Sequence, residues 1–330
     1  MKIAVTRPPA KLNLFLELLG KRSDGFHEID TVMVPIDLCD ELKLWRTDDP
    51  GIELQVGWLP SIEIVAARLG VECGSPQADS LLSIPSGESN LVHRALTEFS
   101  KRLGVTGGFG CQLHKRIPAG AGMGGASSDA ASALLAAATL CDVSLDSPFL
   151  WEIAASIGSD VPFFLGDPQG GSGGGAIRAA RARGRGEKIE ATPIQGTLNF
   201  VVVFPGASLS TPTVYGHSVV PDQPLSAESL VAALRSGDLA ATQTSLSNRL
   251  AQSAKEILPR IDEILKTMWR FGMTACQLTG SGSACFAVVQ SADEARHCAN
   301  RLRSLLEPGA FVIDARSVSL PAGITIGDTK

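Results

Sequence analysis

The chain lacks the features that mark several classes of protein. No stretch reaches the ~18 consecutive apolar residues that a membrane-spanning helix needs, and the opening MKIAVTRPPAKLN has no apolar core of a secretory signal. Basic residues are not in excess, since 29 Lys and Arg stand against 34 Asp and Glu, so the footprint of a nucleic-acid-binding protein is missing. We therefore expect a cytoplasmic protein without membrane or nucleic-acid partners. The sequence leaves open whether it is a monomer or a homodimer.

The spacing of the cysteines and the single tyrosine are also informative. The seven cysteines are scattered and contain no CxxC pair, which is typical of reduced thiols in the cytosol rather than of a disulfide framework. Only one tyrosine, Tyr215, is present.

With 330 residues and a hydrophobic content of 44%, the chain is long enough for two cores. We predict two domains, 1–195 and 196–330, the second opening on the apolar strand TLNFVVVFP.

The middle of the chain contains a glycine-rich loop between a strand and a helix. Apolar residues alternate over 109–117, as in a strand, and an alanine-rich run follows the glycines, as in a buried helix. Glycines allow positive φ and keep no Cβ near a phosphate, and the N–H groups at a helix start bind anions. The loop therefore predicts a phosphate cradle. The expected nucleotide-binding residues are Pro118, Ala119, Gly120, Ala121, Gly122, Met123, Gly124, Gly125, Ala126, Ser127 and Ser128, together with Asn90.

Other glycine-rich loops have to be weighed against this one. Gly120, Gly122 and Gly125 match the G-x-G-x-x-G spacing of dinucleotide-binding folds, and Asp142 or Asp146 stands about 20 residues on. No strand leads to either aspartate, which weakens the Rossmann interpretation. The ATPase pattern G-x-x-x-x-G-K-[ST] is absent, because no lysine follows the glycines.

Three further segments extend the pattern to both ends of the chain. They are PPAKLNLFLELLGKRSDGFHEIDTVM at 8–33, GSDVPFFL at 158–165 and LTGSGSACFAVV at 278–289. Together with the central loop, these segments resemble the motifs of the GHMP kinase superfamily. The resemblance implies an α+β fold, with an N-terminal domain like domain 2 of ribosomal protein S5 and a ferredoxin-like C-terminal domain. It also implies an insertion near 58–86.

Within the superfamily, AKLNLFL, DGFHEIDT and GSDVPFFL are similar to the kinases of the non-mevalonate isoprenoid pathway that use ATP to phosphorylate the 2-hydroxyl of a cytidine-diphosphate-linked methylerythritol. Two alternatives stay open at this point. One is another small-molecule kinase of the mevalonate or homoserine type. The other is a nucleotide-binding module without catalysis.

The resemblance also implies catalytic roles. Phosphoryl transfer depends on positioning and charge neutralisation, so a cradle, Mg²⁺, a cation and a partner for the acceptor hydroxyl are expected. Lys11 matches the cation, and Asp160 matches the general base or proton acceptor, whether it takes the proton early or late. Ser128, with Ser127 as a second candidate, is expected beside the β-phosphate and the metal ion.

The substrate-binding residues are implied in the same way. Phe26 would stack on the cytosine ring, His27 would read its edge, and Tyr215 from the second domain would supply the opposite face. Asn13 would hold the methylerythritol or the diphosphate. Thr211 and Pro212 would line the same cleft, and Gly280, Ser281 and Gly282 would pack against the phosphate loop or approach the substrate diphosphate.

One basic segment is given no catalytic role. Residues 166–187 are rich in glycine and then in arginine, with Arg178, Arg181, Arg183 and Arg185. Such a composition is typical of a mobile, solvated surface loop, although arginines there are able to reach phosphate.

In the C-terminal part of the chain, helices are expected near 225–234, 239–248 and 257–270.

Overall fold

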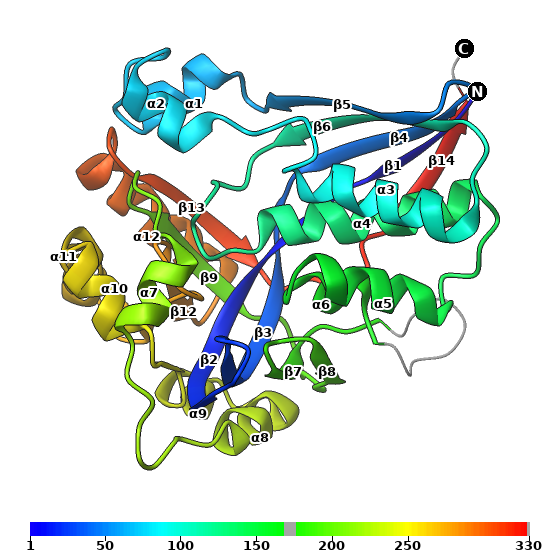
Figure 1. Cartoon of the computed structure of the whole chain (residues 1–330). Coiled ribbons are helices and arrows are strands. Elements are labelled where there is room, and N and C mark those ends of the chain that lie inside the picture. The colour runs from blue at the N-terminus through cyan, green and yellow to red at the C-terminus, as the bar shows by residue number, and fades with distance from the viewer. Residues whose placement is uncertain (168–175, 329–330) are drawn as a thin grey trace.

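The computed structural model describes residues 1–167 and 176–328 as three sheets with helices packed between and outside them (Figure 1). None of the helices in these two ranges is long and apolar enough to cross a membrane. The first sheet has the strand order β14, β1, β4, β6, β5, and only the β5 and β6 pair is parallel. Its strands are β1 (Lys2–Thr6), β4 (Glu41–Thr47), β5 (Gly51–Trp58), β6 (Gly108–Lys115) and β14 (Ile324–Asp328).

The second sheet is built around a long hairpin. Its order is β10, β2, β3, β7, β8, and the short β10 runs parallel to β2. The strands are β2 (Pro9–Lys21), β3 (His27–Cys39), β7 (Ala180–Gly184), β8 (Lys188–Ala191) and β10 (Ser247–Asn248). Gly25 has a φ of +87° in the β2–β3 turn, a conformation that glycine adopts without strain. This turn carries the DGFH motif to the tip of the hairpin.

The third sheet forms the centre of the C-terminal region, with the order β11, β12, β9, β13. Its strands are β9 (Asn199–Phe204), β11 (Cys276–Leu278), β12 (Cys285–Val289) and β13 (Phe311–Arg316). Both faces are buried, and successive residues of β9 alternate between two cores. Phe200 and Val202 pack toward the β2–β3 hairpin, whereas Val201 and Val203 pack toward the outer helices.

The helices fall into three groups. Two short ones, α1 (Ile62–Arg68) and α2 (Pro76–Leu82), follow β5. Four pack beside the first sheet: α3 (Leu91–Leu103), α4 (Gly125–Leu140), α5 (Pro148–Ile157) and α6 (Val161–Leu165). The others belong to the C-terminal region: α7 (Thr211–His217), α8 (Glu228–Ser236), α9 (Leu239–Thr244), α10 (Ala251–Ile257), α11 (Arg260–Arg270) and α12 (Ala292–Leu306).

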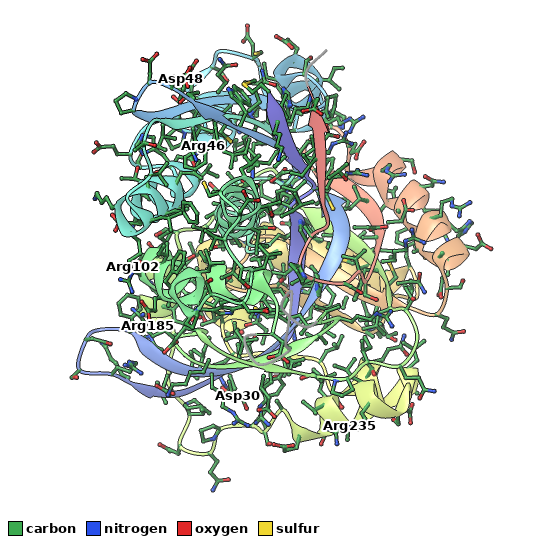
Figure 2. The ribbon with its side chains drawn as sticks, turned by 90° about the vertical axis from the view of Figure 1, so that its right-hand side faces the viewer. Asp30, Arg46, Asp48, Arg102, Arg185 and Arg235 are labelled. Atoms are coloured by element: carbon green, nitrogen blue, oxygen red, sulfur yellow. The ribbon has the colours of Figure 1, made fainter. Side chains whose placement is uncertain are left out.

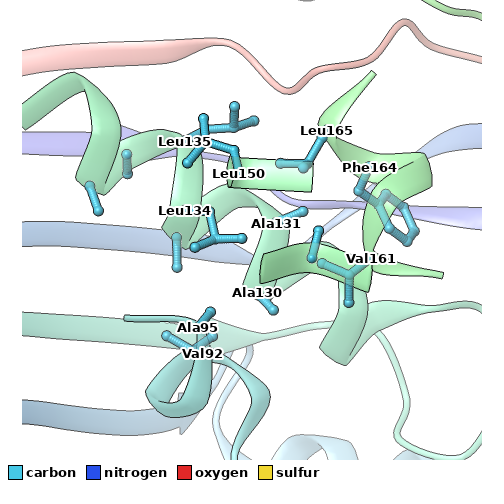
Figure 3. Packing of buried hydrophobic residues seen from close by; sticks show 14 of the residues in the cluster. Val92, Ala95, Ala130, Ala131, Leu134, Leu135, Leu150, Val161, Phe164 and Leu165 are labelled. Carbon is cyan, nitrogen blue, oxygen red and sulfur yellow. The ribbon is translucent and has the colours of Figure 1, made fainter. Parts of the chain in front are cut away.

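Helix α4 is the central element of the N-terminal region. Its alanine-rich sequence leaves small side chains that allow close approach on every side, and all residues from Ser128 to Ala138 are buried. Figure 3 shows Val92 and Ala95 of α3 beside α4, with Val161 and Phe164 of α6 on another side. This packing fixes the start of α4, and with it the glycine-rich loop.

Most of the expected elements are present where the patterns indicated them. Asn90 caps α3, because its side chain accepts a hydrogen bond from the Val92 N–H at 2.8 Å. The predicted α+β fold class is confirmed, since helices pack against three sheets that are largely antiparallel. The helix expected at 239–248 is shorter, because the chain leaves it after Thr244 to form β10. The helix expected at 257–270 is present as α11 but begins at Arg260, because Pro259 occupies its N-cap and Ile257 is the last residue of α10.

The basic segment was wrongly predicted to be a loop throughout. Residues 180–184 form β7, paired with β3 and β8, while residues 168–175 lie outside the described ranges. Ala180 and Ala182 face the core, and Arg181 on the other face holds the buried Asp30 through two hydrogen bonds of 2.7 Å. The small alanines let an arginine-rich strand pack against α6 and its neighbours.

The division into domains 1–195 and 196–330 stays a prediction. The final strand departs from it, because β14 pairs with β1 and so lies in the sheet of the N-terminal region. The segment 58–86, expected to be an insertion, contains α1 and α2. Their residues Ala66 and Leu82 share a core with Phe204 of the third sheet.

Candidate active site

A cleft of about 830 Å³ lies where the hairpin, the glycine-rich loop, the start of α6 and α7 meet. Almost every residue that the sequence predicted for the site lines it. Those lining residues are Lys11, Asn13, Phe26, His27, Asn90, Pro118, Ala119, Gly120, Ala121, Gly122, Met123, Gly124, Gly125, Ala126, Ser127, Asp160, Thr211, Pro212, Tyr215, Gly280 and Ser281. Two predicted residues, Ser128 and Gly282, do not line it.

Lys11 and Asp160 form an ion pair inside the cleft. The distance from Lys11 Nζ to Asp160 Oδ2 is 3.5 Å, and the lysine side chain is 4% exposed while the aspartate side chain is 35% exposed. Lys11 Nζ also donates to the Gly122 carbonyl at 2.8 Å and to Asn13 Oδ1. Burial lowers the pKa of Lys11, and the negative charge of Asp160 opposes that shift. The lysine is therefore fixed, whereas the carboxylate remains accessible to a ligand.

The glycine-rich loop has the backbone that a phosphate cradle requires. Gly120, Gly122 and Gly124 have φ values of +63°, +73° and +71°, in the left-handed region that favours glycine. A Cβ on Gly122 would lie 2.3 Å from the Thr279 carbonyl oxygen, so the loop packs directly on the turn between β11 and β12. The Ala284 N–H donates to the Ala121 carbonyl at 3.1 Å across the same contact. The two glycine motifs thus support each other's backbone.

The two serines at the start of α4 point in different directions. Ser127 lines the cleft, but Ser128 is 0% exposed and its hydroxyl has no hydrogen-bond partner in the described structure. The helical rotation between neighbouring residues turns the Ser128 side chain away from the cleft and into the interior. The geometry therefore does not support the expected contact of Ser128 with a metal ion, and it presents Ser127 in its place. Within the described ranges, no group of three or more His, Cys, Asp or Glu side chains is arranged to hold a metal.

A buried cluster under the same helix was missed by the sequence analysis. Lys115 at the end of β6 donates to Asp40 and to Asp129, and all three side chains are at most 4% exposed. Burial raises the pKa of Asp129 to about 8, since Lys115 offsets only part of the cost and Asp40 adds a second negative charge. Asp129 Oδ1 has no partner within the described part of the chain. Every second residue from 109 to 117 faces the core, and Lys115 is one of them. A lysine at a buried position needs an acidic partner, and this is the signal in the sequence that could have indicated the cluster.

The other end of the cleft is aromatic. Phe26 at the hairpin tip is 50% exposed, and the rings of His27 and Tyr215 lie 5.4 Å apart with an interplanar angle of 40°. Burial lowers the pKa of His27, and the positive charge of Lys21 lowers it further. The imidazole is therefore neutral near pH 7, with one nitrogen able to donate and the other to accept.

A network of short polar side chains connects the two ends. Asn13 donates from Nδ2 to Thr31 Oγ1 at 2.8 Å, and its backbone N–H donates to Thr279 Oγ1 at 3.0 Å. Thr211 Oγ1 and Ser281 Oγ are 2.9 Å apart. Asn13 is 3% exposed and accepts a hydrogen bond from Lys11 Nζ, so it holds the lysine side chain in position. Gly280 and Ser281 reach the cleft, whereas Gly282 packs behind it against Leu278 and Leu209.

Comparison with known proteins identifies a family of kinases. The family models for the GHMP kinases N terminal domain and the GHMP kinases C terminal domain match residues 90–167 and 230–307. A 4-diphosphocytidyl-2-C-methyl-D-erythritol kinase of Rhodopirellula baltica is 46% identical, over 97% of this chain and 97% of the relative. One of Listeria monocytogenes is 34% identical, over 93% of this chain and 94% of the relative.

Solved structures support the same assignment. A crystal structure of 4-(cytidine 5'-diphospho)-2C-methyl-D-erythritol kinase has a TM-score of 0.71 and 31% identity, covering 95% of this chain and 99% of its own. A homoserine kinase from Cytophaga hutchinsonii shares the fold, with a TM-score of 0.68 and 18% identity over 98% of this chain and 97% of its own. The chain belongs to the GHMP kinases, and within them to the family of 4-diphosphocytidyl-2-C-methyl-D-erythritol kinases.

Proposed function

We propose that this chain transfers the γ-phosphoryl group of ATP to the 2-hydroxyl of 4-diphosphocytidyl-2-C-methyl-D-erythritol, giving the 2-phosphate and ADP. Relatives with this activity in their names match nearly the whole chain. The observation that carries the proposal is the Lys11 and Asp160 pair, which lies in one cleft with the glycine cradle and the aromatic end.

The glycine-rich loop and α4 suit the phosphates of ATP. The loop backbone has no Cβ to block a close approach, and the 16-residue helix begins at Gly125 with its free N–H groups. Mg²⁺ bound to the nucleotide would neutralise phosphate charge. Because the protein offers it no carboxylate cluster in the described ranges, we propose that phosphate oxygens, water and the Ser127 hydroxyl would hold the ion.

Asp160 is proposed to receive the proton of the acceptor hydroxyl. The hydroxyl oxygen forms a bond to the γ-phosphorus, the bond to the oxygen bridging the β- and γ-phosphates breaks, and the proton passes to an Asp160 carboxylate oxygen. Lys11 keeps Asp160 oriented and offers positive charge to the moving phosphoryl group. Its contact with the Gly122 carbonyl fixes it relative to the cradle.

The aromatic end is proposed to recognise cytosine. Phe26 and Tyr215 provide flat apolar faces, and the neutral His27 can hydrogen-bond to the edge of the base. Asn13, Thr211 and Pro212 line the path between this end and Asp160, with Gly280 and Ser281 beside them. The cytoplasmic location and the monomeric or dimeric state expected from the sequence stay predictions.

A panel of acceptors tests the function. ADP release is measured with 4-diphosphocytidyl-2-C-methyl-D-erythritol, the unlinked methylerythritol, mevalonate and homoserine, each at the same ATP concentration. We expect ADP release with the first compound alone. Turnover of mevalonate or homoserine at an equal or higher kcat/KM would assign the chain to another small-molecule kinase. Binding of ATP with no turnover of any acceptor would indicate a nucleotide-binding module.

A further inference from the structure

The basic side chains in the cleft are not equally available to a ligand. Lys11 is paired with Asp160, and Lys115 is buried between Asp40 and Asp129. Of the basic residues that line the described cleft, Lys21 and Arg185 have no acidic partner within 4.0 Å. Among the cationic side chains that line the cleft in the described ranges, these two are therefore the ones free to pair with a diphosphate.

Arg185 occupies the tight turn between β7 and β8. Gly184 and Gly186 on either side have φ values of +78° and +117°, and the Arg185 N–H donates to Glu187 Oε2 at 2.6 Å. The turn is thus built by its own glycines and by Glu187, independently of the Arg185 side chain. Figure 2 shows Arg185 near the loop that joins β2 and β3.

The turn spans the distance between the two ends of the proposed substrate. The Arg185 guanidinium carbon lies 5.0 Å from the centroid of the Phe26 ring. A Cβ on Gly186, the next residue, would lie 3.7 Å from Asp160 Oδ1. Arg185 therefore stands between the aromatic end and the proton acceptor. Lys21 is exposed, and its positive charge lowers the pKa of His27. Lys21 therefore lies at the aromatic end of the cleft.

The neighbouring arginines have other partners. Arg181 binds Asp30 and Glu228, Arg178 donates to the Gly196 carbonyl at 2.6 Å, and Arg183 faces Glu190 at 3.9 Å. Asp24 at the hairpin tip is paired with Arg22 at 3.1 Å. Among the arginines in the described part of this segment, Arg185 is the one that lines the cleft.

Resting on the proposed function, we propose that Arg185 binds the diphosphate of the substrate and so positions the 2-hydroxyl at Asp160. In 4-diphosphocytidyl-2-C-methyl-D-erythritol the diphosphate joins the cytidine to the methylerythritol. With the base at Phe26 and the hydroxyl at Asp160, the diphosphate must cross the region beside Arg185. A guanidinium binds two phosphate oxygens in a fixed fork, which a lysine cannot reproduce.

The test compares Arg185→Ala with Arg183→Ala, a control two residues earlier on β7 that does not line the cleft. Calorimetric titration with CDP and with cytidine separates the diphosphate from the base. We expect Arg185→Ala to weaken CDP about ten- to hundredfold, the effect of losing charge-assisted hydrogen bonds, and cytidine less than twofold. The KM for the full substrate should rise in parallel, with the KM for ATP unchanged. Arg185→Lys should recover only part of the affinity.

Two results would overturn the inference. Equal losses for CDP and cytidine would mean that Arg185 supports only the Phe26 ring, and an unchanged affinity for CDP would mean that it faces solvent when ligand binds. Titration of the wild-type protein with UDP tests the proposed function separately, because in both of these cases the wild-type protein should still bind CDP more tightly than UDP. A wild-type protein that binds CDP no better than UDP would contradict the proposed substrate, and with it this role.

Discussion

Replacing Gly122 by alanine tests how the two glycine motifs hold the catalytic lysine. The new Cβ would meet the Thr279 carbonyl oxygen at 2.3 Å and the Gly282 N and O at 3.0 Å, all of which are backbone atoms. The loop or the β11–β12 turn must therefore move. Gly104→Ala is the matched control, because Gly104 has a φ of +65° but a Cβ there meets nothing within 4 Å.

The two variants separate backbone strain from steric overlap. An alanine in the left-handed region costs ~1–2 kcal/mol at either position. Forcing atoms into a well-packed contact costs typically ~1–3 kcal/mol in addition, and only at Gly122. We therefore expect the free energy of unfolding to fall by about 1–2 kcal/mol for Gly104→Ala and by about 2–5 kcal/mol for Gly122→Ala.

Activity should separate the variants further. The Gly122 carbonyl accepts a hydrogen bond from Lys11 Nζ at 2.8 Å, so movement of the loop displaces Lys11 from Asp160. A displacement near 1 Å can lower turnover by about a hundredfold. Urea unfolding followed by circular dichroism gives the stability, and ADP release gives kcat. Equal stability and equal kcat in the two variants would refute the tight packing of the loop on Thr279.

Four further changes test individual residues. Asp160→Asn should lower kcat by ~10²–10⁴-fold with the Kd for ATP within a few fold, and full activity would exclude Asp160 as the proton acceptor. Ser127→Ala should raise the KM for Mg-ATP more than Ser128→Ala, because only Ser127 lines the cleft; the reverse order would restore Ser128 as the metal-side residue. Tyr215→Ala should raise the substrate KM by the loss of a stacking face worth ~1–3 kcal/mol, with Tyr215→Phe near wild type, and an unchanged KM in both would make the ring a packing residue. The pKa of Asp129 is raised to about 8 in the folded state. Between about pH 4 and about pH 8, Asp129 therefore binds more protons in the folded state than in the unfolded state. The contribution of Asp129 to the free energy of unfolding falls as the pH rises through that range. Asp129→Asn should therefore flatten the fall in urea-unfolding free energy over that range, whereas an identical pH profile would contradict the raised pKa.

Local patterns predicted part of the fold. The strand before the glycine-rich loop, the buried helix α4 after it and the apolar strand β9 follow from patterns among residues that lie within a few positions of one another. The strand β7 was missed because arginines obscured its period of two, although Ala180 and Ala182 were visible on the buried phase. The pairing of β14 with β1 joins the two ends of the chain, and no local pattern encodes it.

The candidate site divides in the same way. The motifs predicted that Lys11, Asp160 and the glycine-rich loop belong to one site, and all of them line the same cleft. The orientation of Ser127 and Ser128 depends on how α4 rotates against α3 and α6, which neighbouring residues do not determine. The Lys115 cluster depends on Asp40, 75 residues away in the chain. Such long-range partners become visible only in the folded structure.

The position of the transferred phosphoryl group tests the account most directly. ³¹P and ¹³C NMR of a reaction containing ATP and 4-diphosphocytidyl-2-C-methyl-D-erythritol identify the carbon that carries the new phosphate. Because the accessible carboxylate of Asp160, paired with Lys11, is the proposed proton acceptor for the 2-hydroxyl, we expect a single phosphomonoester on C2, formed in step with ADP and nearly absent with Asp160→Asn. Phosphate on another hydroxyl, or inorganic phosphate as the sole product, would contradict the proposed reaction.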